Sequence, residues 1–102
     1  MSLFDALLRY KNEGRLKRFE MHGSKKATVS LANGKSFLAY MANQYIIGES
    51  DIAEAAASPK ANLLIYNNWD NLSTSAIKEA KRLDIEVYTF GFFAHKLDDM
   101  NA

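Results

Sequence analysis

Residues 63–90, LLIYNNWDNLSTSAIKEAKRLDIEVYTF, decide the fold of this chain. Residues 63–66 form a continuous apolar run, which is typical of a strand buried on both faces. A helix capped by Ser73 or Thr74 follows, and a second strand is expected over residues 85–89. Because one short helix joins the two strands, they must run parallel, with the right-handed crossover that such units almost always adopt.

Three further helices are predicted from their start or stop signals. The first covers residues 2–11 and ends at Gly14. Ser50 is expected to cap the second, which Pro59 stops, and Gly91 leads into the last. The apolar face of the first helix is predicted to hold Leu3, Phe4, Leu7 and Leu8.

Alternating polar and apolar residues predict three strands between the first two helices. Residues 15–22 form one strand and residues 26–41 form a hairpin. Asn33 and Gly34 suit a two-residue type I′ turn, which needs two positive φ angles. The predicted order is therefore α-β-β-β-α-β-α-β-α, and the expected fold is one α/β domain over residues 1–102 with a small mixed sheet.

The composition excludes several classes of site. The 102 residues include no cysteine, which rules out disulfides, thiolate metal ligands and a cysteine nucleophile. No apolar run reaches the roughly 18 residues of a membrane helix, so no membrane association is expected and the predicted location is the cytoplasm. Neither a G-x-G-x-x-G motif nor a P-loop is present, which leaves nucleotide binding without support.

Charge is distributed unevenly along the chain. Residues 1–35 carry eight basic and three acidic side chains, a net charge of +5, whereas residues 36–102 carry five basic and nine acidic ones, a net charge of −4. This asymmetry permits a face that binds the phosphates of DNA or RNA, but head-to-tail association and a merely uneven solvated surface are equally open. The candidate phosphate-binding residues are Arg9, Lys11, Arg15, Lys17, Arg18, Lys25 and Lys26.

The C-terminal half, over roughly residues 60–98, resembles the Mrr-like branch of the restriction-endonuclease-like superfamily. The resemblance lies in an apolar strand with a polar turn (63–67), a capped helix with the spacing Ala-x-x-x-Ala (75–83), a short strand (85–89) and a terminal helix (91–97). A helix, three meandering strands, a helix and a parallel strand is also the element order of that superfamily's core. The resemblance implies a nuclease-like fold.

The catalytic motif of that superfamily is absent. Its nucleases hold Mg²⁺ with an Asp near the second strand and with an acidic residue or Gln, then any residue, then Lys on the third. Here the second strand, residues 27–32, has no carboxylate, and residues 35–40 contain neither E-x-K nor Q-x-K. The resemblance therefore implies an inactive relative that binds nucleic acid without cleaving it and needs no cofactor.

A metal-dependent nuclease with a migrated site is the remaining catalytic hypothesis. Glu20 on the first strand, together with Asp51 or Glu54 on the second helix, would then hold Mg²⁺. Acidic residues in the first turn of a helix more often stabilise its dipole, and strand-end charges are more often solvated. His22 and His95 have no third imidazole or thiolate to complete a zinc site.

Two further regions are candidates for binding. The loop of Asn67, Asn68, Trp69 and Asp70 follows a parallel strand, where ligands collect in open α/β sheets, although such turns often only satisfy their own backbone. The C-terminal segment holds more aromatic surface than a small domain easily hides, which predicts a homodimer or another protein–protein interface. Its aromatic residues are Phe90, Phe92 and Phe93.

Overall fold

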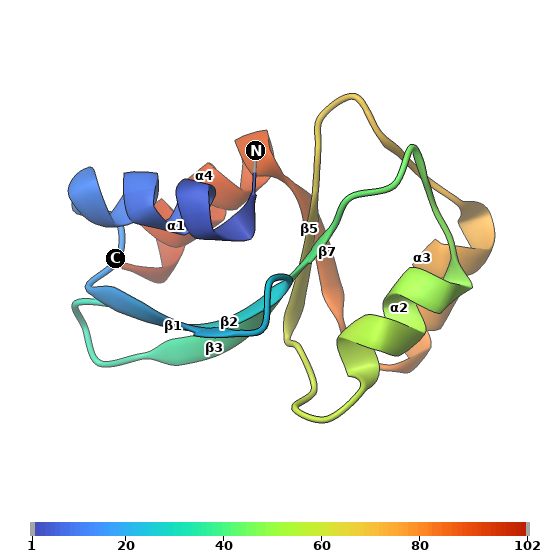
Figure 1. The fold of residues 1–102 in the computed structure, drawn as a ribbon, viewed down its shortest axis with the longest axis horizontal. Helices are drawn as coiled ribbons and strands as arrows, with labels where there is room; N and C mark the ends of the chain where they lie inside the picture. The colour runs from blue at the N-terminus through green and yellow to red at the C-terminus, as the bar shows by residue number, and fades with distance from the viewer. Residues whose placement is uncertain (1, 102) are drawn as a thin grey trace.

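Over residues 2–101, a computed structural model describes four helices and a mixed five-stranded sheet, so the predicted α/β class is confirmed (Figure 1). The predicted element order also holds, with two additional strands of two residues each. The elements are α1 (Leu3–Asn12), β1 (Arg18–His22), β2 (Lys26–Ser30), β3 (Ser36–Ala42), β4 (Ile46–Ile47), α2 (Glu49–Ala56), β5 (Leu63–Tyr66), β6 (Asn71–Leu72), α3 (Thr74–Arg82), β7 (Glu86–Thr89) and α4 (Phe90–Met100).

The five-stranded sheet has the order β1-β2-β3-β5-β7. Strands β1, β2 and β3 are antiparallel neighbours, whereas β3, β5 and β7 run parallel. The pairing of β5 with β7, from Leu63 opposite Glu86 to Tyr66 opposite Thr89, confirms the parallel unit predicted from residues 63–90. We call β1 and β2 the antiparallel half of the sheet, and β3, β5 and β7 the parallel half; β4 and β6 form a separate parallel pair.

The helices cover the two faces of the sheet unequally (Figure 1). Helices α1 and α4 pack on one face of all five strands, around a core that includes Leu7, Val29 and Phe93. Helices α2 and α3 pack on the opposite face of the parallel half only, around a core that includes Tyr40 and Leu64. Strand β5 is therefore buried on both faces, as its continuous apolar sequence predicts.

The hairpin between β2 and β3 differs from the prediction in its turn. Ser30 pairs with Ser36, so the loop has five residues and is not a two-residue type I′ turn. The Gly34 N–H donates to the Leu31 carbonyl oxygen (3.1 Å), and φ is positive at Gly34 (+88°) but not at Asn33. This is the geometry of a type I turn followed by a left-handed bulge residue, which also suits an Asn-Gly pair.

Two helix details also differ from the prediction. Gly48, and not Ser50, is the N-cap of α2, and the Asp51 carboxylate accepts a hydrogen bond from the Gly48 N–H (3.1 Å). On α1 the buried face runs through Leu3, Ala6, Leu7 and Tyr10, which leaves Phe4 (48%) and Leu8 (39%) exposed. At α3 the prediction is confirmed for Ser73, whose hydroxyl accepts from the Ala76 N–H (3.1 Å).

Candidate nucleic-acid interface

The antiparallel half of the sheet presents one face that no helix covers. In β1 the side chains on this face are exposed, and in β2 they are half-buried, while the intervening side chains pack toward α1 and α4. The register aligns the side chains of this face in three rows, Arg18–Ser30–Ser36, Glu20–Thr28–Leu38 and His22–Lys26–Tyr40. We call the uncovered polar part the open sheet face; it consists of Arg18, Glu20, His22, Lys26, Thr28, Ser30 and Ser36.

The hydroxyl groups of the open sheet face were not among the residues selected from the sequence. Thr28 and Ser30 alternate in β2 with the fully buried Ala27 and Val29. This alternation is the sequence signal that places both hydroxyls on the side of the sheet away from the core. Hydroxyl groups both donate and accept hydrogen bonds, so they are suited to contact phosphate or sugar oxygens.

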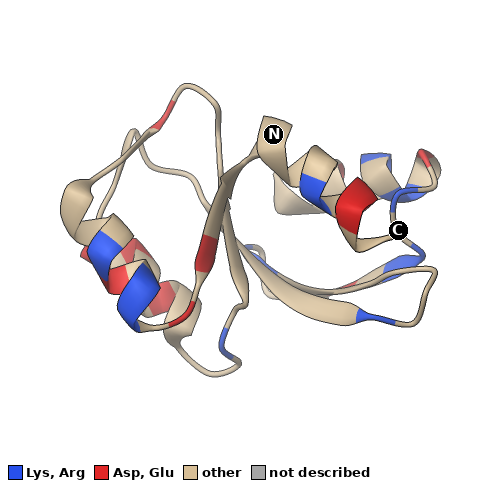
Figure 2. Cartoon of the chain, turned by 180° about the vertical axis from the view of Figure 1, so that it is seen from behind, with Lys and Arg blue, Asp and Glu red and all other residues tan. Residues whose placement is uncertain are grey.

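Cations lie at both ends of the open sheet face. Lys17 and Lys35 immediately precede β1 and β3, at the same end of the sheet as Arg18, and the Lys17 N–H donates to the Ser30 carbonyl oxygen (2.8 Å). Lys25 lies in the β1–β2 turn at the opposite end. Figure 2 shows these basic segments of the hairpins together with a separate basic group on α3.

The predicted phosphate-binding residues differ in whether their side chains already have partners within the protein. Arg15 donates to Asp98 Oδ2 (2.8 Å), to Glu13 Oε1 (3.0 Å) and to the Ala94 carbonyl oxygen (3.2 Å), so it joins the α1–β1 loop to α4. Arg9 pairs with Glu13 (3.1 Å). The structure thus places Arg18 on the open sheet face, with Lys17 just before it in the chain, and it places Arg9 and Arg15 in contacts of their own. Lys11 is exposed on α1.

The ion pairs around Glu13 shift the pKa values of their members. Hydrogen bonds from Arg9, followed by those from Arg15, lower the pKa of the Glu13 carboxyl group. The hydrogen bond to Glu13 raises the pKa of Arg15, and the nearby Asp98 charge adds to this effect. Both side chains therefore stay charged over the physiological range and stabilise each other.

A second set of contacts anchors the β1–β2 turn to α2. The Lys26 ammonium group donates to the carbonyl oxygens of Ala57 (2.6 Å) and Pro59 (3.0 Å), just beyond the end of α2. Lys25 Nζ lies 4.0 Å from Glu54 Oε1, at the outer limit of an ion pair. The cationic side chain of Lys26 is therefore a structural cap, whereas Lys25 is only loosely held.

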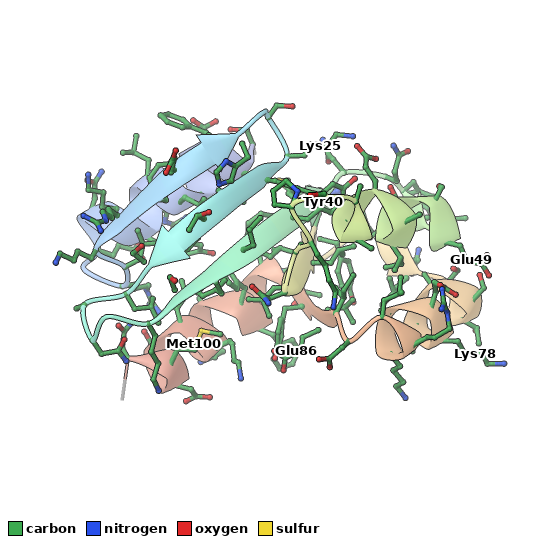
Figure 3. The ribbon with its side chains drawn as sticks, turned by 90° about the horizontal axis from the view of Figure 1, so that it is seen from below. Lys25, Tyr40, Glu49, Lys78, Glu86 and Met100 are labelled. Carbon is green, nitrogen blue, oxygen red and sulfur yellow. The ribbon has the colours of Figure 1, made fainter. Side chains whose placement is uncertain are left out.

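A cavity of about 370 Å³ lies between the β1–β2 turn and α2. Figure 3 shows Tyr40 and Lys25 at this place, where β3 passes beneath the turn. Tyr40 is 1% exposed, and its buried hydroxyl group lies beside the Glu54 carboxylate, although not in good hydrogen-bond geometry with it. Burial, followed by the hydrogen-bonding contact with Glu54, raises the pKa of the Tyr40 phenol. The cavity is lined by His22, Lys25, Lys26, Tyr40, Glu54 and neighbouring backbone.

The three carboxylates of the migrated-site hypothesis have separate surroundings. Asp51 is buried and bonded to the Gly48 N–H, Glu54 lines the cavity beside Tyr40, and Glu20 lies on the open sheet face opposite Thr28. Within residues 2–101, no group of three or more His, Cys, Asp or Glu side chains is placed to hold a metal ion.

The loop after β5 lies at the carboxyl edge of the parallel half, as predicted. Asn67 is buried, and its amide group donates to Asn43 Oδ1 (3.0 Å) and Asp70 Oδ2 (3.1 Å), which fixes the loop. Asn68 Oδ1 accepts from the Gly91 N–H (3.3 Å) at the start of α4. Next to this contact is an open cavity of about 420 Å³, lined by Asn68, Thr89, Gly91, Phe92 and His95.

The aromatic surface differs from the predicted one. Phe93 is fully buried in the core and Phe90 packs against it, so of the three predicted interface residues only Phe92 (68%) is largely exposed. Trp69 (71%) is exposed in the loop after β5. The exposed apolar side chains at this carboxyl edge are Tyr45, Ile46, Trp69 and Phe92, and we call them the edge cluster.

Comparisons of the chain with protein-family models, with curated proteins and with solved structures give no match. Among the helices of the described residues, none combines the length and the apolar character needed to span a membrane.

Proposed function

We propose that this protein binds the sugar–phosphate backbone of nucleic acids on its open sheet face and does not cleave it. The observation that carries the proposal is the uncovered, wholly polar surface of β1 and β2, which offers hydroxyl groups and is flanked by Lys17, Arg18 and Lys35 at one end and by Lys25 at the other. Lysine, arginine and hydroxyl contacts to phosphates give affinity without reading the base sequence.

The proposed fold relationship supports the same function. A helix, a three-stranded meander, a helix and a parallel strand is the order expected for a restriction-endonuclease-like core, and we infer that the chain has this core. Its second and third strands carry no carboxylate, so the residues that hold Mg²⁺ in active members are missing. We therefore infer a binding protein derived from a nuclease fold.

An electrophoretic shift assay with a short single-stranded oligonucleotide tests the proposal at about 50 and 200 mM salt. With about four phosphate contacts, the logarithm of the binding constant should fall with that of the salt concentration with a slope of roughly −3. The double variant Arg18→Gln and Lys35→Gln should weaken binding by about a hundredfold, because each of the two charge-assisted contacts contributes roughly 1.5 kcal/mol, or about tenfold.

The matched control removes the same charge elsewhere. Lys78 and Lys81 are exposed on α3, so the double variant Lys78→Gln and Lys81→Gln has the same net charge as the test variant. It should retain most of the affinity. Equal weakening in both variants would show that only overall charge matters, and absence of binding at low salt would reject the proposed function.

A protein–protein interface at the edge cluster is the second candidate function. Four large apolar side chains are exposed at one edge of the molecule, and such patches on soluble proteins mark interaction sites. If the patch pairs two copies of the chain, sedimentation should show a dimer that Trp69→Ser with Phe92→Ser converts to a monomer. A monomer at high concentration before substitution would exclude self-association through this edge.

A further inference from the structure

Strand β7 is the last strand of the sheet on its parallel side, so one side of its backbone has no strand beside it. The Glu86 N–H donates to the Asn62 carbonyl oxygen (3.0 Å), so Glu86 and Tyr88 direct their backbone groups toward β5. The N–H and C=O groups of Val87, between them, therefore point away from the sheet. Strand β7 lies behind β5 in Figure 1 and in front of it in Figure 2.

A groove runs along this free edge of β7. It is a cavity of about 370 Å³ with Ile77, Ala80 and Lys81 of α3 on one side and the consecutive residues 84–88 on the other. Successive residues of a strand point to opposite faces of the sheet. A groove that is lined by all of them must therefore follow the edge of the strand, where a further strand would lie.

The two edge strands of the sheet differ in how well they are protected. Strand β1 exposes Arg18, Glu20 and His22, and charged side chains on an edge strand oppose pairing with another chain. In β7 only Glu86 is exposed, and residues 87–89 are half-buried. An edge of this kind is suited to accept an added strand, with main-chain hydrogen bonds supplying affinity.

The sequence of β7 matches a second copy of itself. In an antiparallel pair, two opposite residues can exchange both N–H···O=C bonds, so the outward groups of Val87 would bond to those of Val87 in the second copy. Glu86 is then opposite Tyr88 of the second copy, and Ile85 is opposite Thr89. The first of these pairs joins an acceptor carboxylate to a phenol donor, and no like charges meet.

The charges around the groove also fit a second copy. Residues 77–88 carry three basic and three acidic side chains, so two such surfaces do not repel each other. The groove itself is lined by both signs, with Lys81 on α3 and Asp84 and Glu86 along the strand. An interface around a twofold axis needs a self-complementary surface, and a strongly acidic or basic partner would find no match here.

We propose that two copies of this chain pair antiparallel through their β7 strands, with Val87 at the twofold axis, and form one continuous sheet. This inference goes beyond the proposed function and does not depend on nucleic-acid binding. Because β7 is only four residues long, the pairing supplies few hydrogen bonds, and the dimer should be reversible.

Sedimentation equilibrium of the full chain, at concentrations up to about 1 mM, should show monomers in equilibrium with dimers. Val87→Pro removes the outward N–H group and with it one inter-strand hydrogen bond from each copy. It should raise the dissociation constant of the dimer by about tenfold or more. Proline is tolerated on an edge strand where its nitrogen faces away from the sheet, and circular dichroism checks that the variant folds.

The control is the double variant of the edge cluster, Trp69→Ser with Phe92→Ser, which should leave this dissociation constant unchanged. A dimer that is lost in this control and kept in Val87→Pro would place the interface at the edge cluster and overturn the proposal. A chain that stays monomeric at about 1 mM would overturn it as well.

Disulfide formation tests the register, and it does so even if Val87→Pro fails to fold. The chain has no cysteine, so Glu86→Cys and Tyr88→Cys each introduce a unique thiol. In the proposed register these two positions face each other in a non-hydrogen-bonded pair, with Cα atoms about 4.5 Å apart, which a disulfide can bridge. Identical positions are diagonal neighbours about 7–8 Å apart, which is too far.

A mixture of the two variants should therefore give several times more cross-linked dimer under mild oxidation than either variant alone. Equal yields from the mixture and from the single variants would overturn the proposed register. The outcome of the shift assay with oligonucleotides affects none of these results, so the proposed function and the β7 dimer fail or stand separately.

Discussion

The two halves of the sheet differ in the exposure of the face that lies away from α1 and α4. In the parallel half this face is covered by helices, and in the antiparallel half it is open. In the parallel half, Leu64 and Tyr40 are covered by α2 and α3. In the antiparallel half, Thr28 and Glu20 occupy the equivalent side of the sheet and face solvent or the rim of a cavity. A connection between parallel strands must cross over the sheet, and its helix then covers the face of the sheet. A hairpin connection adds no element that could cover a face.

This difference explains why the candidate binding groups lie on the antiparallel half. A covered face must be apolar, so its sequence is determined by packing and leaves no side chains for a ligand. An uncovered face must be polar, but which polar groups it carries is free to vary. In this chain that freedom produced hydroxyl groups with cations at both ends.

The largest expected effect is a difference in the loss of unfolding free energy between a substitution in the parallel half and one in the antiparallel half. Leu64→Ala removes a fully buried side chain beneath α2 and α3 and should lower the free energy of unfolding by about 2–5 kcal/mol. Ser30→Ala on the open sheet face should change it by no more than about 0.5 kcal/mol. Urea unfolding measures both through the midpoint and the slope. Similar losses in the two variants would mean that the open sheet face is covered in solution.

Sequence patterns predicted the parts of the fold that depend on burial over several residues. The continuous run at residues 63–66 indicated two covered faces, and the alternation in residues 26–30 indicated one. The phase of α1 was predicted only in part, because Leu3 and Leu7 belong to two helical faces, one completed by Phe4 and Leu8 and the other by Ala6 and Tyr10. The exposed Phe4 still contacts Phe19 edge to face at 5.7 Å, as a rim residue.

The candidate site was less predictable because its residues meet across long stretches of sequence. Lys26 binds carbonyl groups 31 and 33 positions away, and Arg15 binds Asp98 across 83 positions. A count of basic residues cannot show which of them have such partners. The cavity at Tyr40 likewise depends on how the β1–β2 turn packs against α2, for which no local pattern exists.

Alkaline pH should lower the free energy of unfolding through the tyrosines of the parallel half. Burial, followed by a hydrogen bond to Glu86, raises the pKa of Tyr88 from 10.0 to about 12, and burial also raises the pKa of Tyr40. Below pH 10.0 the folded and unfolded chains both keep these protons, and the stabilisation is complete. As the pH rises toward about 12, the unfolded chain releases protons that the folded chain retains, so stability falls.

Phenolate absorbance during an alkaline titration measures this effect. Tyr88→Phe should remove a phenol that ionises near pH 12, and Tyr40→Phe should remove one whose pKa burial also raises. The unfolding midpoint should decrease with pH less steeply in each variant than in the unsubstituted chain. An unchanged titration curve in Tyr88→Phe would contradict the raised pKa.

A smaller effect is expected at the C-terminal ends of α1 and α3, which have the same backbone geometry. Helix α1 ends with Gly14 at a positive φ of 78°, where the Arg15 N–H donates to the Tyr10 carbonyl oxygen (2.9 Å). This is a Schellman motif, which requires a left-handed residue. Gly14→Ala should lower the free energy of unfolding by about 1–2 kcal/mol, because the added Cβ makes that conformation unfavourable. Thermal or urea unfolding would show it, and a neutral result would mean that the helix end rearranges without cost.

The smallest effect is expected at the end of α3, where Asp84 occupies the position that glycine has in α1. Its φ is 58°, and the Ile85 N–H donates to the Ala80 carbonyl oxygen (2.8 Å) in the same motif. Asp84→Gly should therefore raise the free energy of unfolding by up to about 1 kcal/mol. The substitution also removes a negative charge from a helix C-terminus, which is favourable by itself.

Asp84→Ala separates the two causes, since it removes the same charge but keeps a Cβ at a positive φ. If the backbone conformation dominates, the alanine variant should be less stable than the glycine variant by about 1 kcal/mol. If the two variants are equally stabilised, the charge at the end of α3 is the cause and the backbone at Asp84 carries little strain. The comparison with Gly14→Ala then shows whether α3 tolerates at its C-terminal end a conformation that α1 accepts only with glycine.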